Sequence, residues 1–224
     1  EMRMGIQTAG ERTKVLYKRP HSNEEVENAV IMVNDNKDKV TAWYDIILDS
    51  PWDTDEDTIE TLMFLSRLPT PYRLTLFSLL FYPGTDLYRK AKKDGMIKND
   101  VDDIYRRHYN GIKPTYLNNL HVLLNKYVSI DIGISPKIMT FLVNKKMRKF
   151  KLSFSLYKIL NFLYPFLKMF KVVEQSLKEI LKGNWFKIWE KIEKWFLRKK
   201  ARIAYEISLG LKKIKNNSKK SPAR

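Results

Sequence analysis

Two carboxylates in one short segment are the first residues of this sequence that could do chemistry. Asp45 lies inside the apolar run 41–48, and Asp49 follows the end of that run directly. Carboxylates are rarely buried unless they are paired, so Asp45 needs a hydrogen-bonding partner or a ligand. Ligand sites in parallel α/β folds collect at the carboxyl ends of strands, where both acids would lie. The alternative is that Asp45 is a buried structural acid and that Asp49 caps a loop.

The elements that position these acids are a strand, a short loop and a helix. The run 41–48 is rich in β-branched, aromatic and aliphatic residues, which is typical of a strand covered on both faces. Pro51 ends the strand, because proline cannot donate to a ladder. Thr54 and Asp57 then have the spacing of a capping box, which predicts a helix to about residue 68.

Two further strand–helix units flank this one. A short strand at 4–7 precedes a helix capped by Ser22, and a strand at 73–82 leads into a helix at 86–93. Three units in regular alternation predict an α/β fold with parallel strands and right-handed crossovers, either an open layer or part of a (β/α) barrel. Three strands are too few to close a barrel.

The carboxyl-terminal half of the chain differs in charge. Residues 1–112 carry 16 Lys and Arg against 19 Asp and Glu, whereas residues 113–224 carry 26 against 6, so the net charges are −3 and +20. This split predicts three parts, namely an α/β domain at 1–98, an all-α basic extension at 99–211 and a disordered basic tail at 212–224.

The basic extension is expected to consist of amphipathic helices. Helices are predicted at 100–107, at 116–127 and after Ser135, which precedes a proline. The run 152–170 carries Lys, Asn and Pro, so it is a poor membrane span and favours a surface or partner-facing helix pair. Farther on, an apolar stripe opposes a basic face. The stripe consists of Trp185, Ile188, Trp189, Ile192, Trp195 and Phe196, and the basic face of Lys187, Lys191, Lys194 and Lys199.

The sequence allows two alternatives for what this basic helix contacts. An anionic membrane surface suits it, because tryptophan and lysine both favour the lipid–water interface. The other alternative is that the stripe packs on neighbouring helices and that the lysines are solvated. A charge of +20 would also attract nucleic acid, but the sequence has no recognised nucleic-acid-binding motif, so nucleic acid is not expected as a partner.

The composition excludes several kinds of site. The 224 residues contain no cysteine, which excludes disulfides, thiolate zinc sites and an iron–sulfur cluster ligated by this chain's own cysteines. His21, His108 and His121 lack metal-ligand spacing, so no metal site is expected in this chain.

Four segments together carry a family resemblance: GIQTAGER at 5–12, LYKRP at 16–20, DIILDSPWDT at 45–54 and FYPGT at 81–85. In this order they resemble the fourth, fifth and sixth strands, with their loops, of radical S-adenosylmethionine (SAM) enzymes. The most similar subgroup carries an N-terminal cobalamin-binding domain. The resemblance covers residues 1–98 and implies the later half of a partial (β/α) barrel.

The chain departs from common forms of the family at two places. It has Thr-Ala-Gly at 8–10, where Ser-Gly-Ser is frequent, and Leu-Asp-Ser-Pro-Trp at 48–52, where Gly-Phe-Pro-Gly is frequent. These differences affect the expected hydroxyl contacts and the reaction subclass.

The resemblance implies a set of SAM-binding residues. Gln7 and Arg19 would approach the methionyl part of SAM, and Asp45 would approach its ribose. Thr8 and the backbone of 81–85, which would face the adenine, are further candidates. The residue types suit these roles, because a guanidinium offers a planar fork to a carboxylate and an ionised carboxylate accepts hydrogen bonds from vicinal hydroxyls. Without the resemblance, Gln7 is a polar residue at a strand end and Arg19 is a loop residue before a proline.

The resemblance also implies parts that this chain does not contain. The [4Fe-4S] cluster of the family is held by a three-cysteine loop after the first strand, so the cluster ligands and the cobalamin-binding domain would belong to a missing N-terminal part of the same protein. Glu1 opens directly into a strand, which favours a fragment or a processed product. We therefore expect a cytoplasmic radical SAM enzyme, peripheral at the inner membrane surface if its basic helices bind lipid. This chain alone is expected not to cleave SAM. The rival hypothesis is a non-catalytic membrane-surface or interaction module built on a half-barrel scaffold.

Overall fold

The computed structural model describes residues 1–106, 111–149, 151–186, 189–190, 192–194, 196–197, 199–201 and 205. The chain divides into two units, Glu1–Phe166 and Leu167–Arg224. Each unit is described by itself below.

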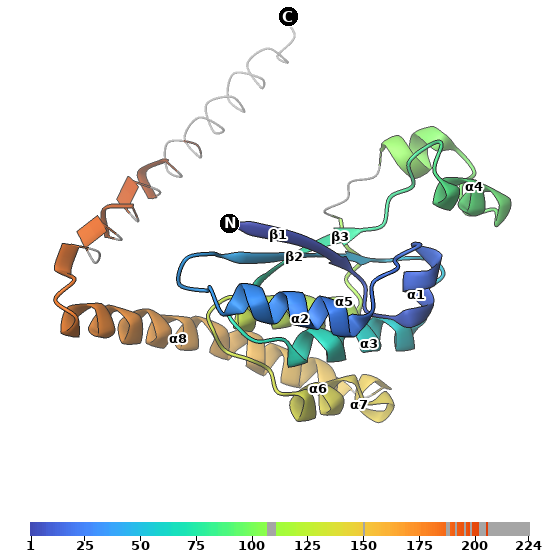
Figure 1. Cartoon of the computed structure of the whole chain (residues 1–224). Coiled ribbons are helices and arrows are strands. Elements are labelled where there is room, and N and C mark those ends of the chain that lie inside the picture. Colours follow the sequence, from blue (N-terminus) through green and yellow to red (C-terminus); the bar gives the residue numbers. More distant parts are fainter. Residues whose placement is uncertain are drawn as a thin grey trace, which may run out of the picture. The chain divides into compact units, whose positions relative to one another are not determined.

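A three-stranded parallel sheet forms the centre of the first unit (Figure 1). Its strands are β1 (Met2–Gln7), β2 (Ala42–Leu48) and β3 (Arg73–Ser78), and they lie side by side in the order of the sequence. The register places Asp45 opposite Gly5 of β1 and Thr75 of β3. The predicted α/β class with three parallel strands is therefore confirmed.

Local sequence signals explain the helices that connect the strands. Ser22 and Glu25 form a capping box at the start of α2 (Asn23–Asn34), and Thr54 and Asp57 form one at the start of α3 (Asp55–Arg67). Both of these helices were predicted. A further helix of six residues, α1 (Glu11–Leu16), lies between β1 and α2 and was not predicted.

One face of the sheet is buried under helices. In Figure 1, α2, α3 and α5 (Tyr116–Val128) lie beneath the strands. Tyr44, Ile46 and Leu48 point into this core, and the alternate residues of β2 are only partly buried. The expectation that β2 is covered on both faces is wrong for the described part of the chain. The apolar run is near-continuous because Trp43 and Ile47 occupy the other face, where they remain partly exposed.

The third strand is shorter than predicted. It ends at Ser78 rather than at residue 82, and Leu79 and Phe81 leave the ladder to join a second small core. This core is built with residues of α4 (Asp86–Lys93) and of a π-helical turn at Val101–Tyr105, where an α-helix at 100–107 was predicted. Its buried members are Leu79, Phe81, Ala91, Ile97 and Ile104.

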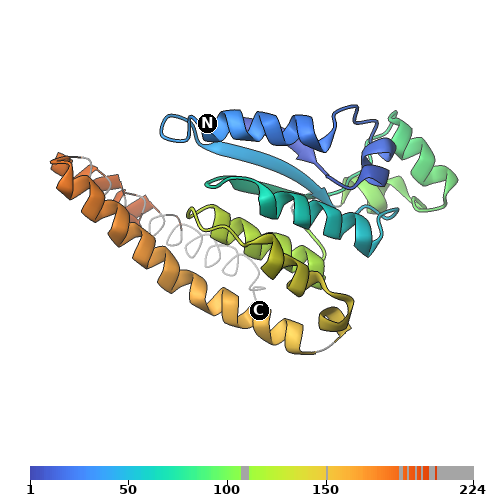
Figure 2. The same ribbon diagram turned by 60° about the horizontal axis from the view of Figure 1, so that its bottom comes forward.

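Helices α5, α6 (Pro136–Val143) and the short α7 (Lys145–Lys149) follow. Figure 2, in which the lower side of Figure 1 comes forward, shows α3, α5 and α6 as a layer, and α3 contacts both of the other two. Buried residues of α5 and α6 belong to the same core as the sheet. The predicted helix at 116–127 and the helix capped by Ser135 are confirmed.

Helix α8 (Lys151–Leu181) continues through Pro165, so a single helix stands where a helix pair was predicted. In the first unit, Tyr157, Leu160 and Tyr164 of α8 pack against the main core. In the second unit, α8 ends before Gly183, whose φ is +72°, and the described residues from 185 to 205 are helical. The predicted disordered tail at 212–224 lies outside the described residues. Among the described helices, none combines the length and the apolarity needed to cross a bilayer.

Candidate functional site

The face of the sheet opposite α2, α3 and α5 is the surface on which the expected site residues gather. Within the described residues of the first unit, Figure 1 shows no helix lying across the middle of this face, and only Ile47 at its carboxyl end packs against the small core that includes α4. Because side chains alternate along a strand, every second residue of each strand points to it. These residues are Arg3, Gly5, Trp43, Asp45, Ile47, Arg73, Thr75 and Phe77, and all of them are partly or fully exposed. We call this surface the open face.

Gln7 and Arg19 are in direct contact at the carboxyl end of β1. The Nε–H of Arg19 donates a hydrogen bond to Oε1 of Gln7 over 2.8 Å. The register of β1 against β2 shifts between Gly5 and Gln7, and Gln7 has a φ of +66°, which non-glycine residues rarely adopt. Such backbone strain persists only where the surrounding structure enforces it, and it is concentrated at functional sites.

Gly5 leaves space in front of this pair. A Cβ placed on Gly5 would lie 3.6 Å from Nη2 of Arg19 and 3.7 Å from Nε2 of Gln7. Both nitrogen atoms therefore lie over bare backbone on the open face. Within the described part of the chain, neither the Nη atoms of Arg19 nor Nε2 of Gln7 makes a hydrogen bond. These donors remain available to an anionic or carbonyl-bearing ligand.

Asp45 lies one strand farther along the open face, opposite Gly5. Its two carboxylate oxygens each accept a hydrogen bond from Nε of Arg3, and both distances are 2.9 Å. Arg3 also donates from Nη2 to Oγ1 of Thr75 over 3.1 Å, and its guanidinium lies 5.9 Å from the ring centre of Phe77. A carboxylate has about four acceptor positions, so Asp45 can still accept hydrogen bonds from a ligand.

Thr8 points into the protein. It is 5% exposed, its Oγ1 lies 3.2 Å from Oγ1 of Thr61, and it accepts a hydrogen bond from the backbone N–H of Gly10 over 3.1 Å. These contacts tie the loop after β1 to α3. The hydroxyl of Thr8 therefore supports the loop that leads to Arg19, and its expected contact with SAM stays a prediction.

A cavity of about 470 Å³ opens on the same face at the carboxyl end of β3. Its lining combines apolar and polar side chains with the backbone that follows β3. The lining residues are Arg3, Ile47, Phe77, Ser78, Leu79, Leu80 and Tyr82. Arg3 thus links the cavity to Asp45. Within the segment 81–85, Phe81 is buried against Trp52 with ring centres 5.7 Å apart, whereas Tyr82 is exposed at the cavity.

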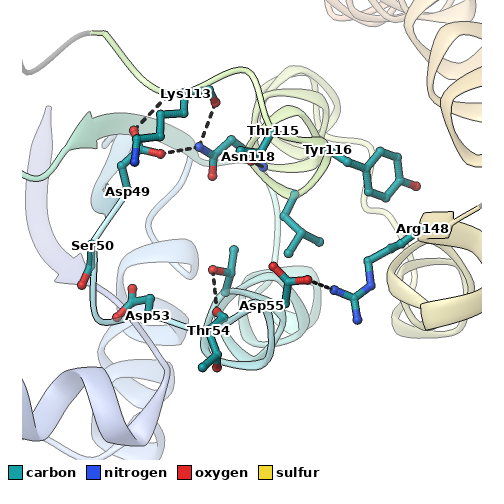
Figure 3. A pocket seen from close by; sticks show the side chains of 12 residues that line it. Asp49, Ser50, Asp53, Thr54, Asp55, Lys113, Thr115, Tyr116, Asn118 and Arg148 are labelled. Atoms are coloured by element: carbon teal, nitrogen blue, oxygen red, sulfur yellow. Dashed lines mark hydrogen bonds and ion pairs between the residues drawn. The ribbon is translucent and has the colours of Figure 1, made fainter.

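A second cavity, of about 400 Å³, lies beyond the carboxyl end of β2 (Figure 3). Asp49 has a φ of +63° and accepts hydrogen bonds from Nδ2 of Asn118 over 2.7 Å and from the backbone N–H of Lys113 over 2.9 Å. Asp55 pairs with Arg148 across the cavity. Asp49 therefore joins the carboxyl end of β2 to α5 and to the segment before it, and Asp55 joins α3 to α7. These contacts of Asp49 are of the loop-capping kind that was the alternative to a ligand contact.

Buried polar groups surround the loop between β2 and α3. Thr13 donates a hydrogen bond from Oγ1 to Oδ1 of Asp53 over 2.7 Å, yet burial raises the pKa of the Asp53 carboxyl. Asp57 accepts hydrogen bonds from Arg12 and from the backbone N–H of Thr54, and Arg12 holds the pKa of Asp57 well below its usual range. Within the described part of the chain, no three His, Asp or Glu side chains could hold a metal ion.

Sequence reasoning missed three contributors to the open face. Arg3 and Thr75 flank Asp45, and Gly5 provides the space beside Arg19. The alternation of Arg3 and Gly5 within β1 signals that both share a face, but their partners depend on the strand register. Comparisons with protein-family models and with curated proteins found no match to this chain.

Proposed function

We propose that this chain is the carboxyl-terminal portion of a radical SAM enzyme and that the open face forms the SAM-binding side of its partial (β/α) barrel. The arrangement of the helices supports this. Doubly wound sheets carry helices on both faces, whereas a barrel carries them only outside its strands. Here the strands follow one another in sequence order, and α2 and α3 lie on the same face. The open face would then be the barrel interior.

The two edges of the sheet differ in a way that favours a preceding strand. At the β3 edge, the side-chain amide of Asn125 on α5 accepts from the backbone N–H of Leu74 over 2.8 Å and donates to its carbonyl over 2.9 Å. This contact occupies part of that edge. Among the described strands, β1 pairs only with β2. We propose that the other edge of β1 receives a parallel strand from the missing N-terminal part of the same protein.

The residues of the open face fit the polar groups of SAM. The free Nη atoms of Arg19 and the amide of Gln7 suit an amino-acid carboxylate and amine, and Asp45 suits the ribose hydroxyls. Asp45 would have to share its oxygens between Arg3 and the ribose. In the complete protein, the reduced cluster would supply the reducing power for the cleavage of bound SAM. This chain has no cysteine to ligate the cluster, so the ligands for the cluster and for cobalamin would lie outside it.

The strongest support for this function is the hydrogen bond between Arg19 and Gln7 beside Gly5. Three residues from two segments of the sequence resemblance meet there, and they present unpaired donors on an uncovered sheet face. We propose a cytoplasmic location, because the cytosol keeps the cysteine ligands that such a cluster requires in the reduced state.

The test starts with the DNA immediately upstream of the codon for Glu1. The proposal expects an in-frame segment that encodes a three-cysteine loop, and an upstream sequence without one would contradict it. The complete protein, reconstituted without oxygen with iron and sulfide, is then expected to convert SAM to 5′-deoxyadenosine under reduction. Arg19→Ala should lose this activity, whereas Arg67→Ala, an exposed arginine on α3, should keep it.

The chain alone gives a second test. Because it lacks the cluster ligands, it is expected to bind SAM weakly or undetectably in a calorimetric titration and to produce no 5′-deoxyadenosine. Turnover by the isolated chain would contradict its being a portion of a larger enzyme. The rival hypothesis, a non-catalytic module, would be favoured if the complete protein folds but does not bind SAM.

A further inference from the structure

The second unit exposes a row of large apolar side chains along α8. Phe170, Val173, Leu177 and Leu181 are between 52% and 85% exposed. They follow one another at spacings of three, four and four residues, which places them on one face of a helix. A face of this kind is normally buried against another element, so its exposure calls for a partner.

The apolar row is followed by aromatic residues after the turn at Gly183. Trp185, Phe186, Trp189 and Ile192 are between 43% and 81% exposed. Two tryptophans within five residues distinguish this segment from an ordinary exposed helix, because tryptophan is enriched where protein meets the headgroup region of a bilayer. The expected apolar stripe is therefore present on the described residues 185, 189, 192 and 196, whereas 188 and 195 lie outside them.

The charge of the same unit is strongly positive. Residues 167–224 carry 17 Lys and Arg against 5 Glu, a net charge of +12. At 100° per residue, Lys168 falls on the side of α8 opposite the apolar row, and Lys171 and Lys178 fall on its flank. Some of this charge is paired locally, since Glu174 contacts Lys171 and Lys178, but the excess remains large.

The combination of these two features selects one class of partner. A second copy of this unit would bring +12 against +12, which repels. Nucleic acid would match the charge but would leave the apolar row in water. An anionic lipid surface satisfies both requirements, because it accepts an apolar face at the acyl boundary and attracts lysines to its headgroups. No described helix can cross a bilayer, which is consistent with a helix that lies along the surface.

We propose that the second unit docks on an anionic membrane surface, with Phe170, Leu177, Trp185 and Trp189 inserted below the headgroups and the lysines held at headgroup level. The proposal does not depend on SAM binding, so either function can fail without the other.

The test uses the full chain and vesicles of phosphatidylcholine, with and without an equal part of phosphatidylglycerol. We expect the chain to co-sediment with the anionic vesicles at low salt and to lose most of this binding at about 0.5 M salt, where screening acts within a few ångströms. Tryptophan fluorescence should shift to shorter wavelength on binding. Little binding to vesicles of phosphatidylcholine alone is expected.

Substitutions separate the apolar contribution from the electrostatic one. Trp185→Ala combined with Trp189→Ala should weaken binding at low salt at least about tenfold, because the interfacial anchors are lost. Met32→Ala, which removes a similarly exposed apolar side chain from α2, should leave binding unchanged. The melting temperature of all variants should match that of the parent chain, because these side chains are exposed.

Four results would overturn the proposal. The first is no binding to anionic vesicles at low salt. The second is equal binding to neutral vesicles at all salt concentrations. The third is a concentration-dependent dimer that the double tryptophan substitution dissociates, which would make a second copy the occupant. The fourth is a lower melting temperature of the double variant without any lipid binding, which would show that the stripe packs within the protein.

Discussion

The Nε–H of Arg19 donates a hydrogen bond to Oε1 of Gln7, 2.8 Å away, and so joins the loop after α1 to the carboxyl end of β1. The bond uses one donor of the guanidinium and one acceptor of the amide. Nη2 of Arg19 and Nε2 of Gln7 face the space that Gly5 leaves open. Each residue therefore orients the other for a ligand without exhausting its own capacity.

The first prediction concerns Arg19 in the complete protein. Arg19→Lys keeps the charge but loses the planar fork, so it should weaken SAM binding about tenfold or more. Arg19→Ala should cost roughly 1.5–3 kcal/mol of binding free energy, the range for hydrogen bonds to charged groups. Calorimetric titration with SAM measures both effects. Equal affinities of Arg19→Lys and the parent protein would show that only the charge matters or that Arg19 is not a ligand contact.

The second prediction concerns Asp45, also in the complete protein. Asp45→Asn should weaken SAM binding by about 1.5–3 kcal/mol if the carboxylate accepts ribose hydroxyl bonds, and the fold should be retained. The structure adds a control, because Arg3 is the other partner of Asp45. Arg3→Ala should release both carboxylate oxygens for the ligand and should not reduce affinity. If Asp45→Asn mainly lowers the melting temperature, the Arg3 contact is its role.

The parts of the fold that sequence alone could predict are those with local causes. The capping box of Thr54 with Asp57 forms as predicted, and Ser22, predicted as a helix cap, forms a second capping box with Glu25. The parallel order of the strands follows from the alternation of strands and helices, because parallel strands need crossovers.

The parts that escaped prediction depend on distant residues. The Arg3–Asp45 pair joins residues 42 positions apart and is fixed only by the register of β1 against β2. Residues 79–82 continue the apolar run of β3, and a run of apolar residues does not reveal that two of its members belong to another core. The open face itself could not be foreseen, because apolar residues on both sides of β2 gave the pattern of a fully covered strand.

The third prediction concerns the stability role of Asp57. Asp57 accepts hydrogen bonds from Thr54 and Arg12, and its folded-state pKa is lowered, chiefly by Arg12. Because the pKa of Asp57 is lower in the folded chain than in the unfolded chain, where it is about 3.9, ionised Asp57 stabilises the fold above about pH 3.9. This stabilisation is lost as the pH falls below about 3.9 towards the pKa of the folded chain. Asp57→Asn should lower the unfolding free energy at pH 7 by about 1–3 kcal/mol and flatten the acid loss below pH 4. Urea unfolding at several pH values measures this.

A matched substitution controls for the general effect of removing a charge. Asp38 is exposed in the turn after α2, and Asp38→Asn should change the unfolding free energy by less than about 0.5 kcal/mol. A similar effect of both substitutions would show that the contacts of Asp57 with Arg12 and Thr54 contribute little.

The fourth prediction concerns His121, which is fully buried in α5. Its Nδ1 lies 3.0 Å from the carbonyl oxygen of Leu117, and its Nε2 has no partner within the described part of the chain. Burial lowers the pKa of His121 to about 4, because the charged imidazolium would be desolvated. In the unfolded chain the pKa of His121 is near 6.5, so between about pH 4 and pH 6.5 the unfolded chain binds more protons than the folded chain does.

Stability should consequently fall as the pH is lowered from about 6.5 to about 4, by up to roughly 3 kcal/mol for a shift of this size. His121→Leu replaces the ring by an apolar group and removes the titration, so its unfolding free energy should be nearly constant across this window. His21→Gln, at an exposed position, should keep the pH dependence of the parent chain. Urea unfolding at pH 7, 6, 5 and 4 tests this pH dependence of the unfolding free energy. These pH values lie above the range in which protonation of Asp57 lowers stability. A parent chain equally stable at pH 7 and pH 4.5 would refute the role of His121.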